Sequence, residues 1–169
     1  MTMRTGFRLS IAAALLAWGG ATLAGEGGWQ CWADAAERYN VPIDLLYSIA
    51  RVETGNKGNL VSPKNKNGTY DIGLMQINSM HLPRLQKHGI TEDKLLADPC
   101  LNLHVGASIL SDAISRLGYT WMAIGAYNAG SPDKRKAYAL KVYAMYDRIT
   151  KERQAKAQRE AGAITGERN

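Results

Sequence analysis

The sequence predicts a mainly α (α+β) domain with one small β-hairpin or irregular wing, and two observations lead to this fold class. Apolar side chains recur at helical spacing in several segments, whereas few segments have the alternation of a strand. One run, residues 55–70, is rich in Gly, Asn, Lys and Ser and contains Asn67-Gly68, the strongest hairpin-turn signal in the chain. With 169 residues, the chain is long enough for one domain with a proper core.

The first two predicted helices are separated by a short break. Residues 29–39 form the first helix candidate. The break is Asn40-Val41-Pro42, and its proline suits the first turn of the helix that follows. This second helix covers residues 42–54 and ends where Gly55 can take the left-handed conformation of a helix C-terminus.

The rest of the chain predicts further helices and one extended segment. Residues 70–78 (YDIGLMQIN) are expected to form a short strand or an extended wall. Asp98 is suited to cap a helix that has Pro99 in its first turn and that ends at Gly118. Beyond it we expect two more helices and a frayed or disordered end, at residues 120–129, 133–150 and 154–169 respectively.

The first 24 residues predict a secretory signal peptide. A positive region with Arg4 and Arg8 precedes a short apolar run at residues 9–18, and small residues then allow cleavage after Ala21 or Ala24. The apolar run is too short for a transmembrane anchor. We therefore expect export to the periplasm, with no integral membrane segment once the signal is removed.

The expected export bears on the redox state of the two cysteines. Cys31 and Cys100 are the only pair in the chain, so an oxidising compartment would allow one intramolecular disulfide. Two buried free thiols are the alternative. No metal site is expected, because two isolated cysteines and the scattered His81, His88 and His104 show no ligand spacing.

The formal charge of +6 is distributed unevenly. Residues 25–130 carry nine Lys or Arg against ten Asp or Glu, whereas residues 131–169 carry ten against five. A basic C-terminal region in an exported protein suits anionic wall polymers, a membrane surface or an acidic partner, although it can also be a solvated helix face. Nucleic acid is not an expected partner, because no nucleic-acid-binding motif is recognisable.

Glu53 is the carboxylate that stands out on chemical grounds. Ile43, Leu46, Tyr47 and Ala50 form an apolar helical stripe, and three residues further along that stripe lies Glu53. A carboxyl group that faces the core at a helix C-terminus keeps its proton, because of desolvation and the negative end of the helix dipole. A general acid needs this property near neutral pH. The alternative is a Glu at the edge of the stripe that turns to water.

Several sequence blocks accompany Glu53 in a fixed order. They are GLMQI at 73–77, AYNAG at 126–130, a helix that starts at Asp98 with Asn102 and Gly106, and Ser62, nine residues after Glu53. In this order and spacing, the blocks resemble the catalytic domain of the soluble lytic transglycosylases, which has a lysozyme-like fold. The resemblance covers roughly residues 30–145 and implies a catalytic domain within residues 25–150, followed by a basic, flexible tail at 151–169.

The resemblance implies a role for each of these residues. Glu53 would protonate the glycosidic oxygen between N-acetylmuramic acid and N-acetylglucosamine. It would then take a proton from the muramic C6 hydroxyl, which attacks C1 of the same sugar and leaves a 1,6-anhydro product. This chemistry consumes no water and uses no metal or cofactor. The residues expected to contact the glycan strand are Ser62, Gln76, Tyr127, Thr54, Met75 and Asn78.

Two positions depart from the family pattern. Thr54 stands where the family usually has Ser, and it keeps a hydroxyl. Asp71 stands where most soluble transglycosylases have no carboxylate, and residues 65–79 resemble the hairpin of animal-type lysozymes. A second carboxylate across the cleft could stabilise an oxocarbenium-like state or act as a nucleophile. Asp71 could equally hold the muramic acetamido group or only stiffen the hairpin.

The sequence thus predicts an exported enzyme that cleaves peptidoglycan glycan strands as a lytic transglycosylase. Its size and signal peptide are most similar to the specialised transglycosylases of conjugation, type III secretion or type IV pilus systems, so components of such an apparatus are expected partners. Two alternatives stay open: a lysozyme-like hydrolase that uses Glu53 and Asp71, and a non-catalytic glycan-binding scaffold component.

Overall fold

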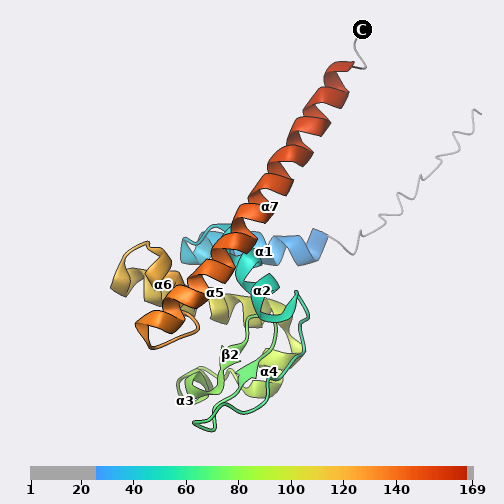
Figure 1. Ribbon diagram of the computed structural model, residues 1–169. Coiled ribbons are helices and arrows are strands. Elements are labelled where there is room, and N and C mark those ends of the chain that lie inside the picture. The colour runs from blue at the N-terminus through green and yellow to red at the C-terminus, as the bar shows by residue number, and fades with distance from the viewer. Residues whose placement is uncertain (1–25, 167–169) are drawn as a thin grey trace, which may run out of the picture.

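The computed structural model describes residues 26–166, and most of them are helical (Figure 1). The elements in chain order are α1 (Glu26–Tyr39), α2 (Ile43–Thr54), β1 (Asp71–Ile72), β2 (Ile77–Asn78), the 3-10 helix η1 (Ser79–His81), α3 (Leu82–Gln86), α4 (Glu92–Ala97), α5 (Pro99–Leu117), α6 (Trp121–Ala126) and α7 (Pro132–Gly166). The predicted fold class, mainly helical with a small β wing, is confirmed.

The helix α2 contributes several residues to the core. It contacts α1 and α7, while α5 packs against α1 and α6, and α6 packs against α7. Leu46, Ile49 and Ala50 of α2 are completely buried. The buried face is wider than the predicted stripe, because Leu45 and Ser48 are buried as well. The core therefore packs against the helix whose last turn carries Glu53.

The ends of the long helices are fixed by the residues that the sequence indicated. Asp98 Oδ1 accepts hydrogen bonds from the backbone N–H groups of Cys100 (2.9 Å) and Leu101 (3.0 Å), which caps α5. At the other end, α5 stops before Gly118, which has a φ of 75°. These caps explain why α5 spans its predicted range.

The β wing is a hairpin whose turn differs from the expected one. Strands β1 and β2 pair antiparallel, with Asp71 opposite Asn78. The chain turns between them at residues 73–76, so the segment expected as one strand or wall is strand, turn and strand. The Asn67-Gly68 turn lies one loop earlier, where it returns the chain so that Val61 bridges Ile72.

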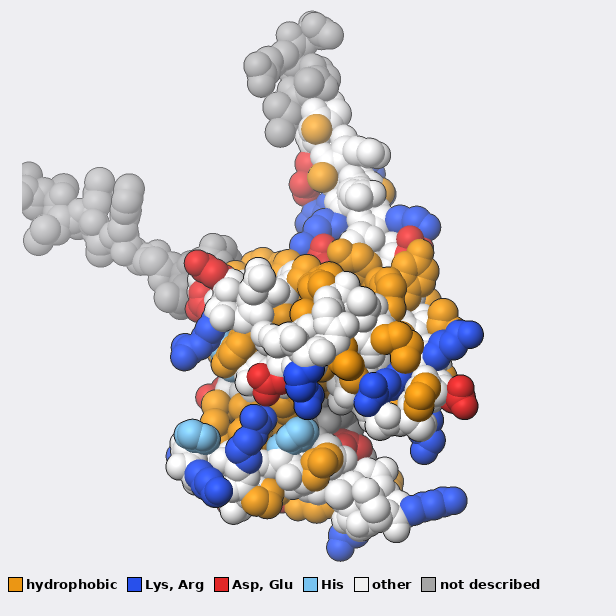
Figure 2. Space-filling model, turned by 90° about the vertical axis from the view of Figure 1, so that its left-hand side faces the viewer, with side chains coloured by type: hydrophobic (Ala, Val, Ile, Leu, Met, Phe, Trp, Pro, Cys, Tyr) orange, Lys and Arg blue, Asp and Glu red, His pale blue; other side chains and the backbone are white. Residues whose placement is uncertain are grey.

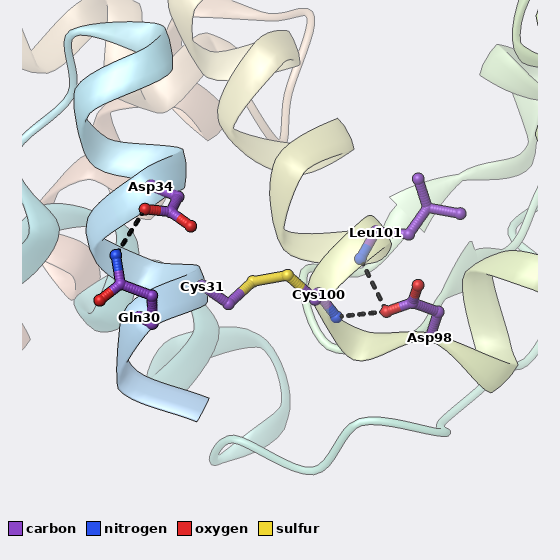
Figure 3. The surroundings of a disulfide bond; sticks show 6 residues. All are labelled: Gln30, Cys31, Asp34, Asp98, Cys100 and Leu101. Carbon is purple, nitrogen blue, oxygen red and sulfur yellow. Dashed lines mark hydrogen bonds between the residues drawn. A yellow bond between two sulfur atoms is a disulfide. The ribbon is translucent and has the colours of Figure 1, made fainter. Parts of the chain in front are cut away.

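A disulfide joins Cys31 of α1 to Cys100 in the first turn of α5 (Figure 3). The two Cα atoms are 5.9 Å apart, and the cysteines are 69 residues apart in sequence. This confirms the predicted pair and excludes the alternative of two free thiols. In the chain-entropy description, closing such a loop stabilises the fold by roughly 4 kcal/mol. His104 lies beside the two sulfur atoms, but both are bonded to each other and offer no thiolate to a metal.

The C-terminal helix is longer than the sequence predicted. A frayed segment was expected from residue 154, whereas α7 continues as a helix to Gly166 and extends away from the other helices (Figure 1). Arg153 anchors the middle of this helix: it forms an ion pair of 2.7 Å with Asp44 and lies 5.3 Å from the ring centre of Trp29. Charged pairs spaced i, i+4, such as Lys156 with Glu160, support the continuation.

The predicted signal peptide lies outside the described residues. Within the described part of the chain, no helix has both the length and the apolarity that a membrane crossing requires.

Candidate active site

The end of α2 fixes the position of Glu53. Gly55 has a φ of 63°, which a residue with a side chain rarely adopts, and its N–H donates to the carbonyl of Arg51 (3.1 Å). The N–H of Asn56 reaches back to the carbonyl of Ala50. This closure ends the helix at Thr54, so the carboxyl group of Glu53 lies in the last turn.

Glu53 is partly buried, and its surroundings hold its proton. Burial is the largest influence and raises the pKa of Glu53 from 4.5 to about 7. The Tyr138 hydroxyl donates to Glu53 Oε1 at 2.5 Å, which lowers this pKa, and the negative charge of Asp71 raises it. The positive charge of Lys141 has a smaller lowering effect. The carboxyl group therefore keeps its proton to a much higher pH than an exposed glutamate does.

Asp71 is held in the hairpin by its neighbours. Its Oδ1 accepts a hydrogen bond of 2.7 Å from Asn78 Nδ2, the residue opposite it in the sheet. Ser62 Oγ lies 3.4 Å from Oδ2 and also accepts from the backbone N–H of Asp71 at 2.9 Å. Both carboxylate oxygens therefore have partners within the wing, and the charge of Asp71 still acts on Glu53.

The turn that joins β1 and β2 is fastened to α5 by a buried amide. Asn102 is completely buried; its Oδ1 accepts from the N–H of Met75, and its Nδ2 donates to the carbonyls of Ile72 and Leu95. Gly73, with a φ of 74°, passes so close that a Cβ there would lie 2.1 Å from Asn102 Nδ2. The amide therefore sets the position of the turn.

Gln76 ends this turn in an unusual conformation. Its φ is 49°, in the left-handed region that non-glycine residues seldom occupy. Its Nε2 donates to the carbonyl of Gly73 at 2.8 Å. The side chain is thereby held at the cleft, and its Oε1 atom is left to accept a hydrogen bond from a ligand.

Tyr127 forms the opposite wall. Its hydroxyl donates to the carbonyl of Met75 at 2.6 Å. Gly106 permits this approach, since a Cβ at that position would lie 3.0 Å from the hydroxyl and 2.7 Å from Met75 Cβ. Burial, together with the charges of Glu53 and Asp71, raises the pKa of Tyr127 well above its usual value. Tyr127 is therefore a neutral donor committed to the backbone.

These residues surround a cleft of about 840 Å³ between the helices and the wing, visible as the hollow in Figure 2. Glu53 is not among the lining residues, but its charge influences the lining residue Tyr127, and the charge of the lining residue Asp71 influences Glu53. The lining includes four of the residues expected at the site: Asp71, Gln76, Asn78 and Tyr127.

Three predicted substrate contacts have a different place in the structure. Thr54 and Met75 are buried, at 9% and 0% exposure, and Thr54 Oγ1 donates to the carbonyls of Leu74 and Ala50. A buried side chain offers no surface to a ligand, so the prediction that these two contact substrate is wrong. Ser62 supports Asp71 from outside the cleft lining.

Tyr138 is the site residue that sequence reasoning missed. It is 6% exposed, it lies on α7, and its hydroxyl touches Glu53. A signal was present: Tyr138, Val142 and Ile149 all fall on one face of the predicted helix and are all buried. A buried tyrosine needs a partner for its hydroxyl, and an unpaired carboxylate in the core was the natural candidate.

The fold and the site together define a class of protein: a helical domain with a β wing and a cleft beside a proton-holding carboxyl, an arrangement suited to acid–base catalysis. Among solved structures, an inactive mutant of the lytic transglycosylase Slt from Pseudomonas aeruginosa superimposes with a TM-score of 0.57 and 18% identity. The match covers 75% of this chain and 24% of that one, and at this identity it concerns the fold alone.

Sequence comparisons identify the family. Residues 30–147 match the family model described as the transglycosylase SLT domain, and the chain belongs to this family. Invasion protein IagB of Salmonella typhimurium is 47% identical over 70% of this chain and 76% of its own length. Protein IpgF of Shigella flexneri is 44% identical over 75% of this chain and 85% of its own length.

Proposed function

We propose that this protein is a peptidoglycan lytic transglycosylase that cleaves the β-1,4 bond between N-acetylmuramic acid and N-acetylglucosamine. The observation that carries the proposal is Glu53: a partly buried carboxyl in a transglycosylase SLT domain, with a pKa raised to about 7 and under the electrostatic influence of Asp71, which lines the cleft. At this pKa the group is able both to give and to take a proton near neutral pH.

The hydrogen bond from Tyr138 assigns different tasks to the two oxygens of Glu53. Oε1 accepts from Tyr138, so Oε2 is the oxygen proposed to carry the proton for the glycosidic oxygen. As the bond between C1 and that oxygen breaks, the proton passes to the leaving sugar. The ionised Glu53 then accepts the proton of the muramic C6 hydroxyl while the C6 oxygen bonds to C1. No water enters the balance, and the muramic end is a 1,6-anhydro sugar.

The cleft residues orient the strand for this step. Gln76 offers an acceptor oxygen that suits the N–H of an acetamido group, since its amide nitrogen is already bonded to Gly73. Tyr127 contributes its ring and a hydroxyl oxygen, because its proton is bonded to Met75. Holding the C6 hydroxyl close to C1 raises its effective concentration and favours ring closure over attack by water.

Analysis of the cleavage products tests this proposal. Purified sacculi treated with the protein should release muropeptides with anhydro-muramic ends, recognised by a mass lower than that of the reducing form by one water. Glu53→Gln, which keeps the size of the side chain but holds no transferable proton, should lower the rate at least 100-fold. A Glu53→Gln protein that clears cell walls as well as the wild type would contradict the assignment of Glu53.

A hydrolase is the second candidate, and Asp71 favours it. Asp71 lines the same cleft and acts electrostatically on Glu53, as the second carboxylate of a glycosidase would. Against this, Asn78 and Ser62 occupy its oxygens. Reducing ends that gain water would identify the hydrolase, and Asp71→Asn would then abolish activity. For a transglycosylase we expect Asp71→Asn to retain anhydro products.

A third candidate, a non-catalytic glycan-binding component, would bind sacculi without releasing either kind of end. The proton-holding environment of Glu53 supports an enzyme instead, because a mere binding cleft has no need of it. The predicted signal peptide and the name of the relative IagB, an invasion protein, support a periplasmic enzyme that opens the wall locally for an envelope-spanning apparatus.

A further inference from the structure

An apolar patch lies on the exposed face of α7 and at the start of α6, and none of its residues lines the cleft. On α7, Leu140 is 59% exposed and Tyr143 is 49% exposed. Trp121 of α6 contacts Tyr143 edge to face, with ring centres 5.1 Å apart, and the neighbouring Met122 is exposed as well. In Figure 2, hydrophobic side chains gather around the base of the projecting helix. Exposed apolar side chains that lie together in this way mark a binding surface.

The patch lies between charges of both signs. Side chains spaced three or four residues apart share one face of a helix, and on the exposed face of α7 these positions read acid, base, apolar, apolar, acid, base. They are Asp133, Lys136, Leu140, Tyr143, Asp147 and Lys151. Asp133 and Lys136 form no ion pair with another described residue, and Asp147 pairs with Lys151 through Oδ2 alone.

This order of charges is complementary to itself when the helix is reversed. Lys136 lies six residues before position 142, and Asp147 lies five residues after it. Asp133 and Lys151 lie nine residues before and nine after the same position. Two copies of α7 packed antiparallel about this position would place Lys136 of each copy against Asp147 of the other, and Asp133 against Lys151. A surface for an unrelated partner has no need of such symmetry, whereas a twofold dimer requires it.

We propose that the exposed face of α7, together with the start of α6, binds a second copy of this chain in a twofold, antiparallel dimer. At the register that pairs the charges, Leu140 of one copy meets Tyr143 of the other. Trp121 and Met122 lie beside Tyr143, so they approach their counterparts near the symmetry axis, and the apolar side chains of both copies are covered together. The charges at both ends of the patch fix the direction and the register of the two helices.

The dimer carries two clefts. Each α7 begins at its own cleft, about ten residues before the symmetry axis, so the starts of the two helices are about 30 Å apart along the pair. Two linked sites that bind the same polymer raise its apparent affinity without any new contact. This consequence rests on the proposed function, whereas the dimer itself does not.

Sedimentation equilibrium of the protein without its predicted signal peptide measures the association. The average mass should rise from that of one chain toward that of two between about 1 and 100 μM. Leu140→Glu should raise the dissociation constant of the dimer about 100-fold, because the symmetry buries two carboxylates in the apolar centre. Ala157→Glu adds the same charge at an exposed position further along α7 and should associate like the wild type.

Charge reversal tests the register. Lys136→Glu and Asp147→Lys should each weaken the dimer about tenfold, because each creates two contacts between like charges across the symmetry axis. In a mixed dimer of these two variants, both contacts again join opposite charges. An equimolar mixture should therefore associate within about threefold of the wild type. The losses in the single variants should become smaller as salt rises.

The outcomes separate this inference from the proposed enzyme. A chain that stays monomeric at about 100 μM overturns the dimer, as does a Leu140→Glu protein that associates like the wild type. A mixture that associates no better than its two components overturns the antiparallel pairing. A monomeric wild type whose binding to lipid vesicles or to sacculi is lost in Leu140→Glu assigns the patch to another occupant and overturns the dimer too. Leu140→Glu should cleave short soluble strands at the wild-type rate, so a failed dimer leaves the transglycosylase intact.

Discussion

Glu53 shows how a single residue is given its chemistry by the atoms around it. Burial favours the protonated form, Tyr138 favours the ionised form, and the pKa settles at about 7 because the two influences oppose each other. Deeper burial would raise the pKa of Glu53 further and keep the carboxyl protonated, whereas a second hydrogen-bond donor would lower the pKa and favour the carboxylate. The residue is therefore balanced for the two opposite proton transfers that the proposed reaction requires.

The Tyr138 hydroxyl gives a test of this balance. Tyr138→Phe removes a donor that favours the carboxylate, so the pKa of Glu53 should rise and the alkaline limb of the pH–kcat profile should move to higher pH. The maximal kcat should fall about tenfold, because Glu53 loses the partner that orients it. Tyr143→Phe, an exposed tyrosine on the same helix, is the control. An unshifted limb in Tyr138→Phe would show that Tyr138 does not act through Glu53.

Glu53 should also make stability depend on pH. Its pKa is about 7 in the folded protein and 4.5 without the fold, so the folded state holds the proton more tightly. This residue supports folding most below pH 4.5, and the contribution is lost as pH rises through about 7. Relative to Glu53→Gln, the wild type should lose up to about 3 kcal/mol of unfolding free energy between pH 4.5 and 8. Urea denaturation of both proteins across this pH range measures the difference. Curves of unfolding free energy against pH that run parallel for the two proteins would refute the prediction.

At the scale of elements, the wing depends on Asn102 of α5. Three buried hydrogen bonds join this amide to Ile72 of β1, to Met75 in the turn between β1 and β2, and to Leu95 of α4. The turn presents Gln76 to the cleft and offers the Met75 carbonyl to Tyr127. One side chain thus connects the helical body with both walls of the site.

Asn102→Ala should therefore weaken both the fold and the site. It leaves the Met75 N–H and two carbonyls unpaired beside a cavity, so the unfolding free energy should drop by about 3 kcal/mol. Activity at 20 °C should fall even where the protein stays folded, because the turn that holds Gln76 loses its attachment. Asn59→Ala, at an exposed position, should change neither quantity. Full activity in a folded Asn102→Ala protein would contradict the positioning role.

The elements that the sequence predicted are those with local chemical signals. Asp98, Gly55 and Gly118 mark helix ends through caps and left-handed backbone, and the structure confirms all three. The short helices η1, α3 and α4 were missed, because each is too brief for helical periodicity to develop. The hairpin turn was misplaced because Asn67-Gly68 has the stronger local signal, whereas the actual turn is set by the distant Asn102.

The same contrast between local sequence signals and long-range packing applies to the residues of the site. Glu53, Asp71, Gln76, Asn78 and Tyr127 come together near one cleft, as the sequence motifs indicated. Helical periodicity indicates that Tyr138 is buried, but it does not give the position of α7, and the 85-residue separation from Glu53 is bridged only when α7 packs against α2. For Thr54 and Met75, motif membership gave no information on burial, and both support the site from inside the core.

At the scale of the whole molecule, Arg153 marks the boundary between the part of α7 that packs on the domain and the part that does not. Up to that residue the helix packs on the domain, and residues 155–163 beyond it are exposed. Removing residues 155–169 should leave kcat and KM on soluble strands unchanged and alter the unfolding free energy by no more than about 0.5 kcal/mol. Arg153→Ala should cost about 1 kcal/mol, through its lost pair with Asp44 and its lost contact with Trp29.

The same truncation tests whether this end of the chain docks the enzyme to an envelope apparatus. If it does, the shortened protein should keep its activity on purified sacculi but lose its co-purification with the apparatus and its localisation in cells. Unchanged localisation and partner binding would remove the basis for a docking role.

A helix of 35 residues is about 50 Å long, and α7 begins at the cleft. Its first turns carry Lys134 and Arg135, which line the cleft, and Tyr138, whose hydroxyl donates to Glu53. A partner that bound the far end of α7 would therefore hold a rigid helix whose other end contributes residues to the candidate active site. Such binding would fix the orientation of the cleft relative to the cell wall. The partner would then determine where, and in which direction, the glycan strands are cleaved.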